Sequence, residues 1–286
     1  MGQAGHPLKT KTLQNGVPTR SLLLRYAAIG FLLLWLVAPM IPLLLWSISF
    51  RWYFPSMLPP ELSSRAWEYI FSPTSGALQA LRDTTIIAVA VTFVSILIGV
   101  PAGRALGMYQ FAGKRIVELL VLAPTIVPGL AVVMGIQVVF IKVGLANTII
   151  GVILVHLIPT LPYMVLVMAG VFANYQPEFE EQARSLGAGP LKTIWYVMIP
   201  AILPGVMVGG LFVFLISWSQ YVLTLLIGGG VVLTLPMLLY NFATSGDNAM
   251  TGAISLIFIG PGVLILLLTS RYLTGENAAA GGLGKV

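Results

Sequence analysis

The sequence has no cysteine, only two histidines and few charged residues. The absence of cysteine excludes disulfides, thiolate metal sites and cysteine nucleophiles. Charged residues make up 8% of the chain, whereas soluble domains contain about 25%. Hydrophobic residues make up 58% of the 286 residues, and the mean hydropathy is +0.96. A soluble fold could not bury this much apolar surface, so the sequence predicts an all-α, polytopic membrane protein.

Six segments are apolar enough, and long enough, to cross a bilayer, which requires about 20 residues. They are residues 26–49, 84–105, 116–141, 148–173, 202–227 and 249–272. The first segment is longer than a signal-peptide core and has no cleavage pattern, so we expect it to remain as an anchor. The sequence therefore predicts six transmembrane helices within residues 26–272. Short tails, residues 1–25 and 273–286, flank this domain.

The basic residues divide unequally when the N-terminus is placed in the cytoplasm. Eleven then lie in cytoplasmic segments: Lys9, Lys11, Arg20, Arg25, Arg104, Lys114, Arg115, Arg184, Lys192, Arg271 and Lys285. Four lie outside: Arg51, Arg65, Arg82 and Lys142. Lys and Arg are enriched in cytoplasmic loops, so this bias predicts that both termini are cytoplasmic. Topology thus explains the net charge of +6, and we expect a lipid bilayer and no nucleic acid as partner.

The third and fourth spans each contain a pair of prolines, Pro124 with Pro128 and Pro159 with Pro162. A proline inside a helix removes a hydrogen bond and bends the helix. Such bends adapt helices to a packed bundle, and the alternative is that they shape a central cavity. The similarity of the two spans also introduces the hypothesis of an inverted-repeat secondary transporter, although the halves of the chain show no matching repeat.

Few polar residues within the spans are candidates for function. His156 is either a functional group or a neutral histidine that is hydrogen-bonded to a neighbouring helix. The polar residues of the fifth span either line a translocation path or join helices: Ser217, Ser219, Gln220 and Tyr221. The sequence has no G-x-S-x-G pattern, no cluster of metal ligands and no complete phosphate-binding loop. We therefore expect no catalytic residue, metal site or nucleotide site in this chain.

Residues 174–201 form the most distinctive cytoplasmic segment, which we call the 174–201 loop. Three of the nine carboxylates of the chain lie within residues 178–181. Pro177 and these acids suit the start of a helix, and Gly187 is placed to end it.

The predicted helix has an apolar stripe at positions i, i+4 and i+7, formed by Phe179, Ala183 and Leu186. Glu180 and Arg184 are spaced to form an i, i+4 ion pair. A helix that lies on a membrane usually presents Lys and Arg to the lipid headgroups. The carboxylates of this helix favour docking into a groove of another protein instead.

The spacing of the 174–201 loop resembles the EAA loop of binding-protein-dependent ABC importer permeases. That pattern is E-A-A, three residues, G, nine residues, then I-x-L-P. Glu181, Gly187 and Pro200 match its glutamate, glycine and proline. Gln182 replaces the middle alanine, and two further departures exchange one aliphatic residue for another. The resemblance extends from the second span to the sixth.

The resemblance implies a permease of a type I ABC importer in the bacterial inner membrane. Such a permease forms the translocation pathway with a second permease, as a homo- or heterodimer. A cytoplasmic ATPase dimer binds ATP and Mg²⁺, and an external solute-binding protein delivers the solute. The ATPase-coupling residues that the resemblance implies are Phe179, Glu180, Glu181, Ala183, Leu186, Gly187 and Pro200.

Residues 214–242 resemble the subgroup that carries polyamines, ferric iron, thiamine, sulfate, molybdate or phosphonates. Polyamine permeases tend to have acids in the middle of the fifth span, where this chain has Trp218, Ser219 and Gln220. We expect a small solute, polyamine-like or phosphonate-like. A self-contained secondary transporter or channel is the alternative, but it would need coupling-ion carboxylates within the spans and no EAA loop. A membrane enzyme is a third hypothesis, which lacks a catalytic constellation.

Overall fold

The computed structural model describes residues 19–53, 55–127 and 129–273. Within these residues the regular structure is helical, apart from one antiparallel bridge between Ser49 and Leu62. The predicted all-α class is thus confirmed for the part of the chain that the structure describes. The chain divides into two units, residues 1–42 and 43–286, and we describe each by itself.

The first unit contains α1 (Thr19–Val37) and the start of α2 (Met40–Ser47). These two helices correspond to the predicted first span, which is therefore broken. Pro39 lies at the break, where it has no backbone N–H to continue the helix. The predicted N-terminal tail lies mostly outside the described residues.

Four helices of the described chain are long and apolar enough to span a membrane, and the number rises to six if each of two bent helix pairs is one span. The four are α4 (Ala77–Met108), α7 (Ile149–Ala173), the helical run of residues 190–218, and α13 (Asn248–Leu273). Three of them match the predicted second, fourth and sixth spans. The run of residues 190–218 comprises α9 (Pro190–Thr193), the π-helical turn η2 (Ile194–Met198) and α10 (Ile199–Trp218).

The predicted third span, residues 116–141, is sharply bent in the structure, as its proline pair indicates. The structure has two helices there, α5 (Lys114–Ile126) and α6 (Gly129–Lys142), and their axes differ by 96°. Val127 ends α5 in an extended conformation, with φ −75° and ψ 135°. The residue before a proline is pushed out of the helical region, and the sequence has Pro128 at the next position.

The fifth span also ends earlier than predicted. α10 stops at Trp218, and a separate helix, α11 (Val222–Gly228), follows after three residues. The hydroxyl of Ser219 donates to the carbonyl oxygens of Leu215 at 2.9 Å and Ile216 at 3.3 Å. This side chain thereby satisfies acceptors at the end of the helix. The remaining elements are α3 (Arg65–Ile70), η1 (Pro73–Ser75), α8 (Glu178–Ser185) and α12 (Leu235–Ser245).

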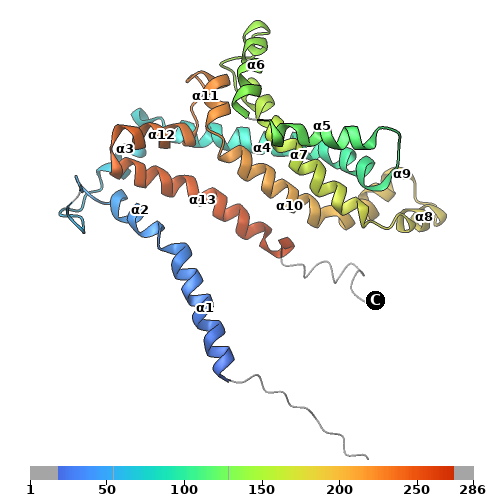
Figure 1. Ribbon diagram of the computed structural model, residues 1–286, viewed down its shortest axis with the longest axis horizontal. Coiled ribbons are helices and arrows are strands. Elements are labelled where there is room, and N and C mark those ends of the chain that lie inside the picture. The colour runs from blue at the N-terminus through green and yellow to red at the C-terminus, as the bar shows by residue number, and fades with distance from the viewer. Residues whose placement is uncertain (1–18, 54, 128, 274–286) are drawn as a thin grey trace, which may run out of the picture. The chain divides into compact units, whose positions relative to one another are not determined.

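The core of the second unit is formed by α4, α7 and α10, which pack pairwise against one another (Figure 1). Gly99 of α4 faces Met164 of α7, and a Cβ atom at position 99 would lie 2.5 Å from the Met164 Cγ atom. One turn further on, Gly103 faces Met168 in the same way. Small residues let helices in membranes approach closely, so these glycines set the α4–α7 spacing.

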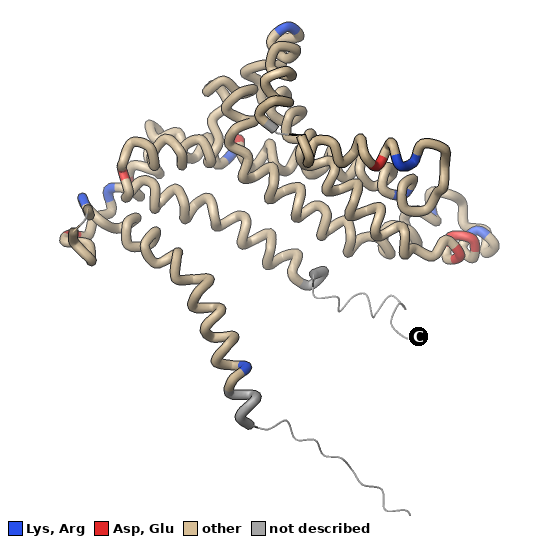
Figure 2. The backbone as a smooth tube through the Cα atoms, viewed as in Figure 1, with Lys and Arg blue, Asp and Glu red and all other residues tan. Residues whose placement is uncertain are grey.

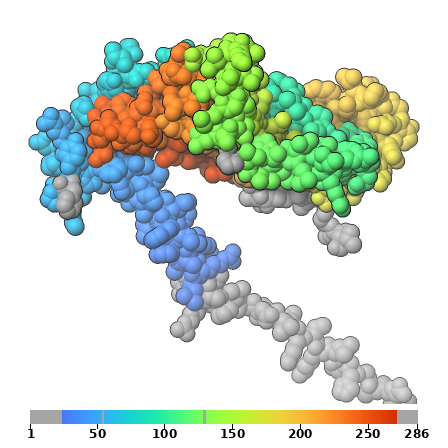
Figure 3. Space-filling model, turned by 45° about the horizontal axis from the view of Figure 1, so that its top comes forward, coloured from blue at the N-terminus to red at the C-terminus, as the bar shows by residue number. Residues whose placement is uncertain are grey.

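α5 contrasts with this core, because none of its residues is buried within the chain. Figure 3 shows the green segment that contains α5 lying open on the surface of the second unit. Its exposed apolar side chains include Ile116, Leu119 and Leu120. This helix therefore presents an apolar face to its surroundings.

Candidate functional site

The acidic cluster of the 174–201 loop forms the first turn of α8 (Figure 2). Pro177 is the N-cap residue, and Glu178, Glu180 and Glu181 follow it. Carboxylates are favourable at this end of a helix, because the unpaired N–H groups and the helix dipole make it positive. The predicted helix is thus confirmed, with bounds of Glu178–Ser185.

Gly187 follows the C-cap residue of α8 and has a left-handed backbone, with φ +84°. Its N–H donates to the Arg184 carbonyl oxygen at 2.9 Å, and the Ala188 N–H donates to the Ala183 carbonyl oxygen at 3.0 Å. These two bonds form a Schellman motif, in which glycine is favoured at the left-handed position. The prediction that Gly187 ends the helix is confirmed.

The apolar stripe of α8 is partly open to its surroundings. Leu186 is 89% exposed and Phe179 is 45% exposed, whereas Ala183 is half-buried. Glu181 is exposed as well. Just beyond the turn, Leu191 and Trp195 add exposed apolar side chains on α9 and η2. α8 thus offers apolar and acidic groups together on accessible surface.

Glu180 differs from its two acidic neighbours because it is buried, with 6% of its side chain exposed. Both of its carboxylate oxygens accept from the Arg104 Nη2 atom of α4, at 2.9 and 3.0 Å. Arg184 adds a longer contact of 3.3 Å to the same carboxylate. The predicted i, i+4 pair of Glu180 and Arg184 is therefore present. No sequence pattern indicates the stronger partner, Arg104, which is 76 positions away.

The Arg104 guanidinium also contacts two side chains other than the glutamate. It lies 5.9 Å from the centre of the Phe172 ring, and its Nη1 atom lies 2.9 Å from the Met198 sulfur. The Tyr175 hydroxyl is buried in this region without an aligned hydrogen-bond partner. Burial, followed by the negative charge of Glu180, raises the pKa of Tyr175 to about 12. The phenol is therefore neutral at physiological pH.

Pro200 lies in the first turn of α10, within a helix that is continuous from residue 190. The residues before Pro200 are therefore joined to the span in one helical run. A proline cannot donate the N–H that would close an α-helical turn onto the Tyr196 carbonyl. The Ile199 N–H instead bonds to the Ile194 carbonyl, which gives the π-helical turn η2.

His156 is buried in a polar network among the spans. Its Nδ1 atom lies 3.0 Å from the Ser217 hydroxyl of α10, and its Nε2 atom lies 3.0 Å from the Thr224 hydroxyl of α11. Thr160 donates to the His156 carbonyl oxygen at 2.8 Å, one turn further along α7. His156 and Ser217 thus join α7, α10 and α11, and both side chains are buried within the chain.

The other three candidates of the fifth span have different surroundings. Ser219 is exposed, and Tyr221 lies against Tyr240 with ring centres 4.6 Å apart. Gln220 lines an apolar cavity of about 250 Å³, together with Pro124 and Pro159. Pro124 of α5 and Pro159 of α7 therefore border a cavity beside the break between α10 and α11.

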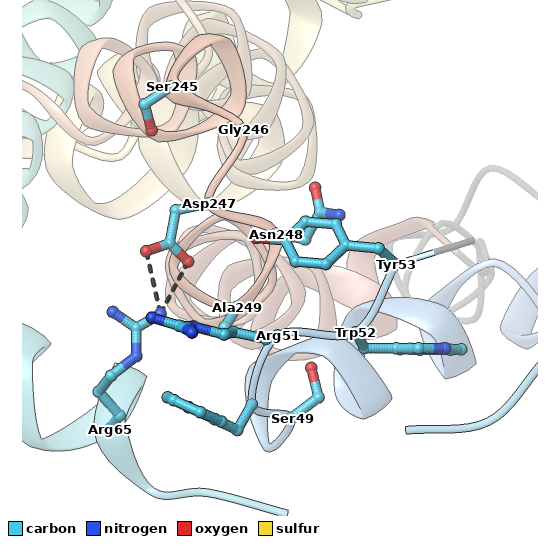
Figure 4. A pocket seen from close by; sticks show the side chains of 11 residues that line it. Ser49, Arg51, Trp52, Tyr53, Arg65, Ser245, Gly246, Asp247, Asn248 and Ala249 are labelled. Atoms are coloured by element: carbon cyan, nitrogen blue, oxygen red, sulfur yellow. Dashed lines mark hydrogen bonds and ion pairs between the residues drawn. The ribbon is translucent and has the colours of Figure 1, made fainter. Parts of the chain in front are cut away.

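A second, more polar pocket of about 370 Å³ lies between the segment after α2 and the N-terminus of α13 (Figure 4). Arg65 donates to both carboxylate oxygens of Asp247, at 3.2 and 3.0 Å. Asp247 also accepts from the Met250 N–H at 3.1 Å and so caps α13. This pair joins α3 to the N-terminus of α13.

Comparisons with known proteins agree with this architecture. Residues 95–274 match the model of a family described as binding-protein-dependent transport system inner membrane component. The chain is 28% identical over 218 residues to the molybdenum transport system permease ModB of Mycobacterium bovis, covering 71% of this chain and 81% of that protein. It is 25% identical over 211 residues to the spermidine/putrescine permease PotC of Haemophilus influenzae, covering 74% and 81%.

The fold resembles a solved bacterial ABC transporter involved in the import of the acidic polysaccharide alginate. The TM-score is 0.67 at 18% identity, over 89% of this chain and 96% of the other. The family model matches more than half of this chain. The protein therefore belongs to the binding-protein-dependent transport system inner membrane components, the multi-pass permease subunits of ABC importers.

Proposed function

We propose that this chain is the permease subunit of an ATP-driven importer and that α8 couples it to separate ATPase subunits. The observation that carries this proposal is the accessible surface of α8. Glu181 and the apolar side chains Phe179 and Leu186 are exposed on one short helix, and Gly187 fixes where that helix ends. An exposed helix with a mixed acidic and apolar surface suits a groove of a protein partner.

The importer has two further partners in this proposal. A second permease, identical or different, completes the translocation pathway, and the uncovered apolar face of α5 supports such a neighbour. An external solute-binding protein delivers the solute. Support for this partner comes from a structural neighbour, with a TM-score of 0.55, that was solved in complex with an alginate pentasaccharide-bound periplasmic protein.

The cargo is a small solute in this proposal. The relatives are named for different cargoes, including molybdenum, spermidine with putrescine, and trehalose. The described lining of the cavity beside α11 contains one amide, from Gln220, and no carboxylate. The same lining contains no basic side chain, so its charge favours neither a polyamine-like cation nor a phosphonate-like anion, and both classes stay in the proposal.

Reversing the charge of Glu181 tests the coupling role of α8. We expect Glu181→Arg to lower the ATP hydrolysis that co-purifies with the tagged chain by about tenfold, since close charge pairs at interfaces are commonly worth more than 1.4 kcal/mol. Glu178→Gln is the matched control, because this exposed acid lies in the same turn and is not assigned to the interface. Full co-purification of ATP hydrolysis with the Glu181→Arg chain would contradict the proposal.

A further inference from the structure

The buried ion pair between Arg104 and Glu180 joins elements that the chain itself does not connect directly. α8 follows α7 through residues 174–177 and leads into α9 and α10. Covalent connection alone would pass a movement of α8 only to these neighbours. α4 lies far earlier in the sequence, and Arg104 on it reaches Glu180 with two hydrogen bonds.

We propose that the Arg104–Glu180 pair is the positioning contact that delivers movement of α8 to α4. This proposal rests on the function proposed for α8. It assigns the two adjacent glutamates different tasks: Glu181 faces the ATPase, whereas Glu180 faces the permease. Successive residues on an α-helix point about 100° apart, so one helix can hold the two carboxylates in different surroundings.

The buried surroundings of the Arg104–Glu180 pair strengthen the attraction between the two side chains. The side chains of Arg104 and Glu180 are 25% and 6% exposed, so water and salt screen their attraction weakly. Charge-assisted hydrogen bonds are also among the stronger polar contacts in proteins. Phe172 and Met198 hold the guanidinium from α7 and η2. Arg104 therefore contacts three separate segments around the base of α8.

The route from Arg104 into the core is short. Gly103 precedes it in α4 and touches Met168 of α7, and Gly99 lies one turn before, against Met164. These close helix contacts leave little room for α4 to move without α7. A displacement of Glu180 is therefore passed to the packed pair of α4 and α7 within one helical turn.

Because the natural chain has no cysteine, one introduced thiol can report on the core without knowledge of the cargo. Gln220→Cys places it at the cavity beside α11, and N-ethylmaleimide is the probe. In the complex with the ATPase, the labelling rate is measured with and without a non-hydrolysable ATP analogue. We expect nucleotide to change this rate by about tenfold, within the range of typical coupling between sites.

Three variants of the Gln220→Cys chain test the Arg104–Glu180 pair: Arg104→Gln, Glu180→Gln and the double variant. We expect each single variant to reduce the nucleotide effect to less than about twofold, and the double variant to be no worse than the singles, because both remove one contact. Arg104→Lys, which retains charge but not the guanidinium, is expected to be intermediate. Glu178→Gln is the control on the same helix.

Several outcomes would overturn the inference. One is a full nucleotide effect in both single variants. Another is loss of the co-purifying ATPase from Glu180→Gln, which would make Glu180 a partner contact and leave the function of α8 intact. A third is an equal fall in thermal stability, ATPase association and nucleotide effect, as expected of a purely structural pair. Retention of the ATPase by Glu181→Arg would instead count against the proposed function itself.

Discussion

At the scale of single residues, sequence neighbours on α8 have different physical roles. Glu178, Glu180 and Glu181 are chemically similar and lie in one turn, yet only Glu180 is buried. The sequence pattern identifies the turn and its charge. It does not identify the buried member, because that depends on Arg104, a residue of another helix. Gly187 is the opposite case, since its role follows from local backbone geometry.

Gly187 gives a prediction that depends on the sign of φ. We expect Gly187→Val to lower the co-purifying ATP hydrolysis several-fold, because a left-handed backbone costs a side-chain-bearing residue about 1–2 kcal/mol and α8 would end differently. Gly187→Asn is the matched control, since asparagine tolerates this conformation better. Equal ATP hydrolysis in the valine and glycine forms would show that the turn is not required for coupling.

At the scale of elements, the sequence predicts helices better than it predicts where they break. α7 matches the predicted span although it contains Pro159 and Pro162. The third span, with a similar proline pair, turns by 96° instead. α7 is packed between α4 and α10, whereas α5 has no buried residue, so packing accounts for the different outcomes. Hydropathy along one chain contains no information about such neighbours.

The contact between α4 and α7 gives a second prediction. We expect Gly99→Leu to lower the free energy of unfolding by about 1–3 kcal/mol, because the larger side chain would overlap Met164. Thermal unfolding of the detergent-solubilised protein measures this change as a lower midpoint. Gly170→Leu is the matched control on α7, since no atom lies within 4 Å of a Cβ atom built there. Equal midpoints for the two variants would argue against a close contact at Gly99.

At the scale of the whole molecule, family and membrane class follow from sequence far more directly than the site does. Low charge and high hydropathy indicate a membrane protein, and the spacing of Glu181, Gly187 and Pro200 indicates the family. The buried network around His156 is evident only in the three-dimensional structure, because its partners Ser217 and Thr224 lie 61 and 68 positions away in the sequence. The orientation in the membrane rests on charge alone and is a prediction.

Single cysteines in the natural cysteine-free chain test this orientation. We expect a membrane-impermeant maleimide to label Thr74→Cys and Lys142→Cys from the outside of intact cells. Glu178→Cys, Ala4→Cys and Ala280→Cys should react only after permeabilisation, because the excess of basic residues places these segments in the cytoplasm. Labelling of the terminal cysteines in intact cells would reverse the predicted topology.

The uninterrupted helix from residue 190 to residue 218 has a geometric consequence. At about 1.5 Å per residue, its 29 residues form a rod about 44 Å long. A tilt of about 5° about its N-terminal end would displace the far end of such a rod by about 4 Å. A displacement of this size would take the 3.0 Å contact between His156 and Ser217, which lies near the far end, out of the hydrogen-bonding range if α7 stayed in place. Any tilt of this size must either break that hydrogen bond or move α7 together with α10. The His156–Ser217 hydrogen bond therefore distinguishes rotation of α7 and α10 as one rigid body from a rearrangement between the two helices.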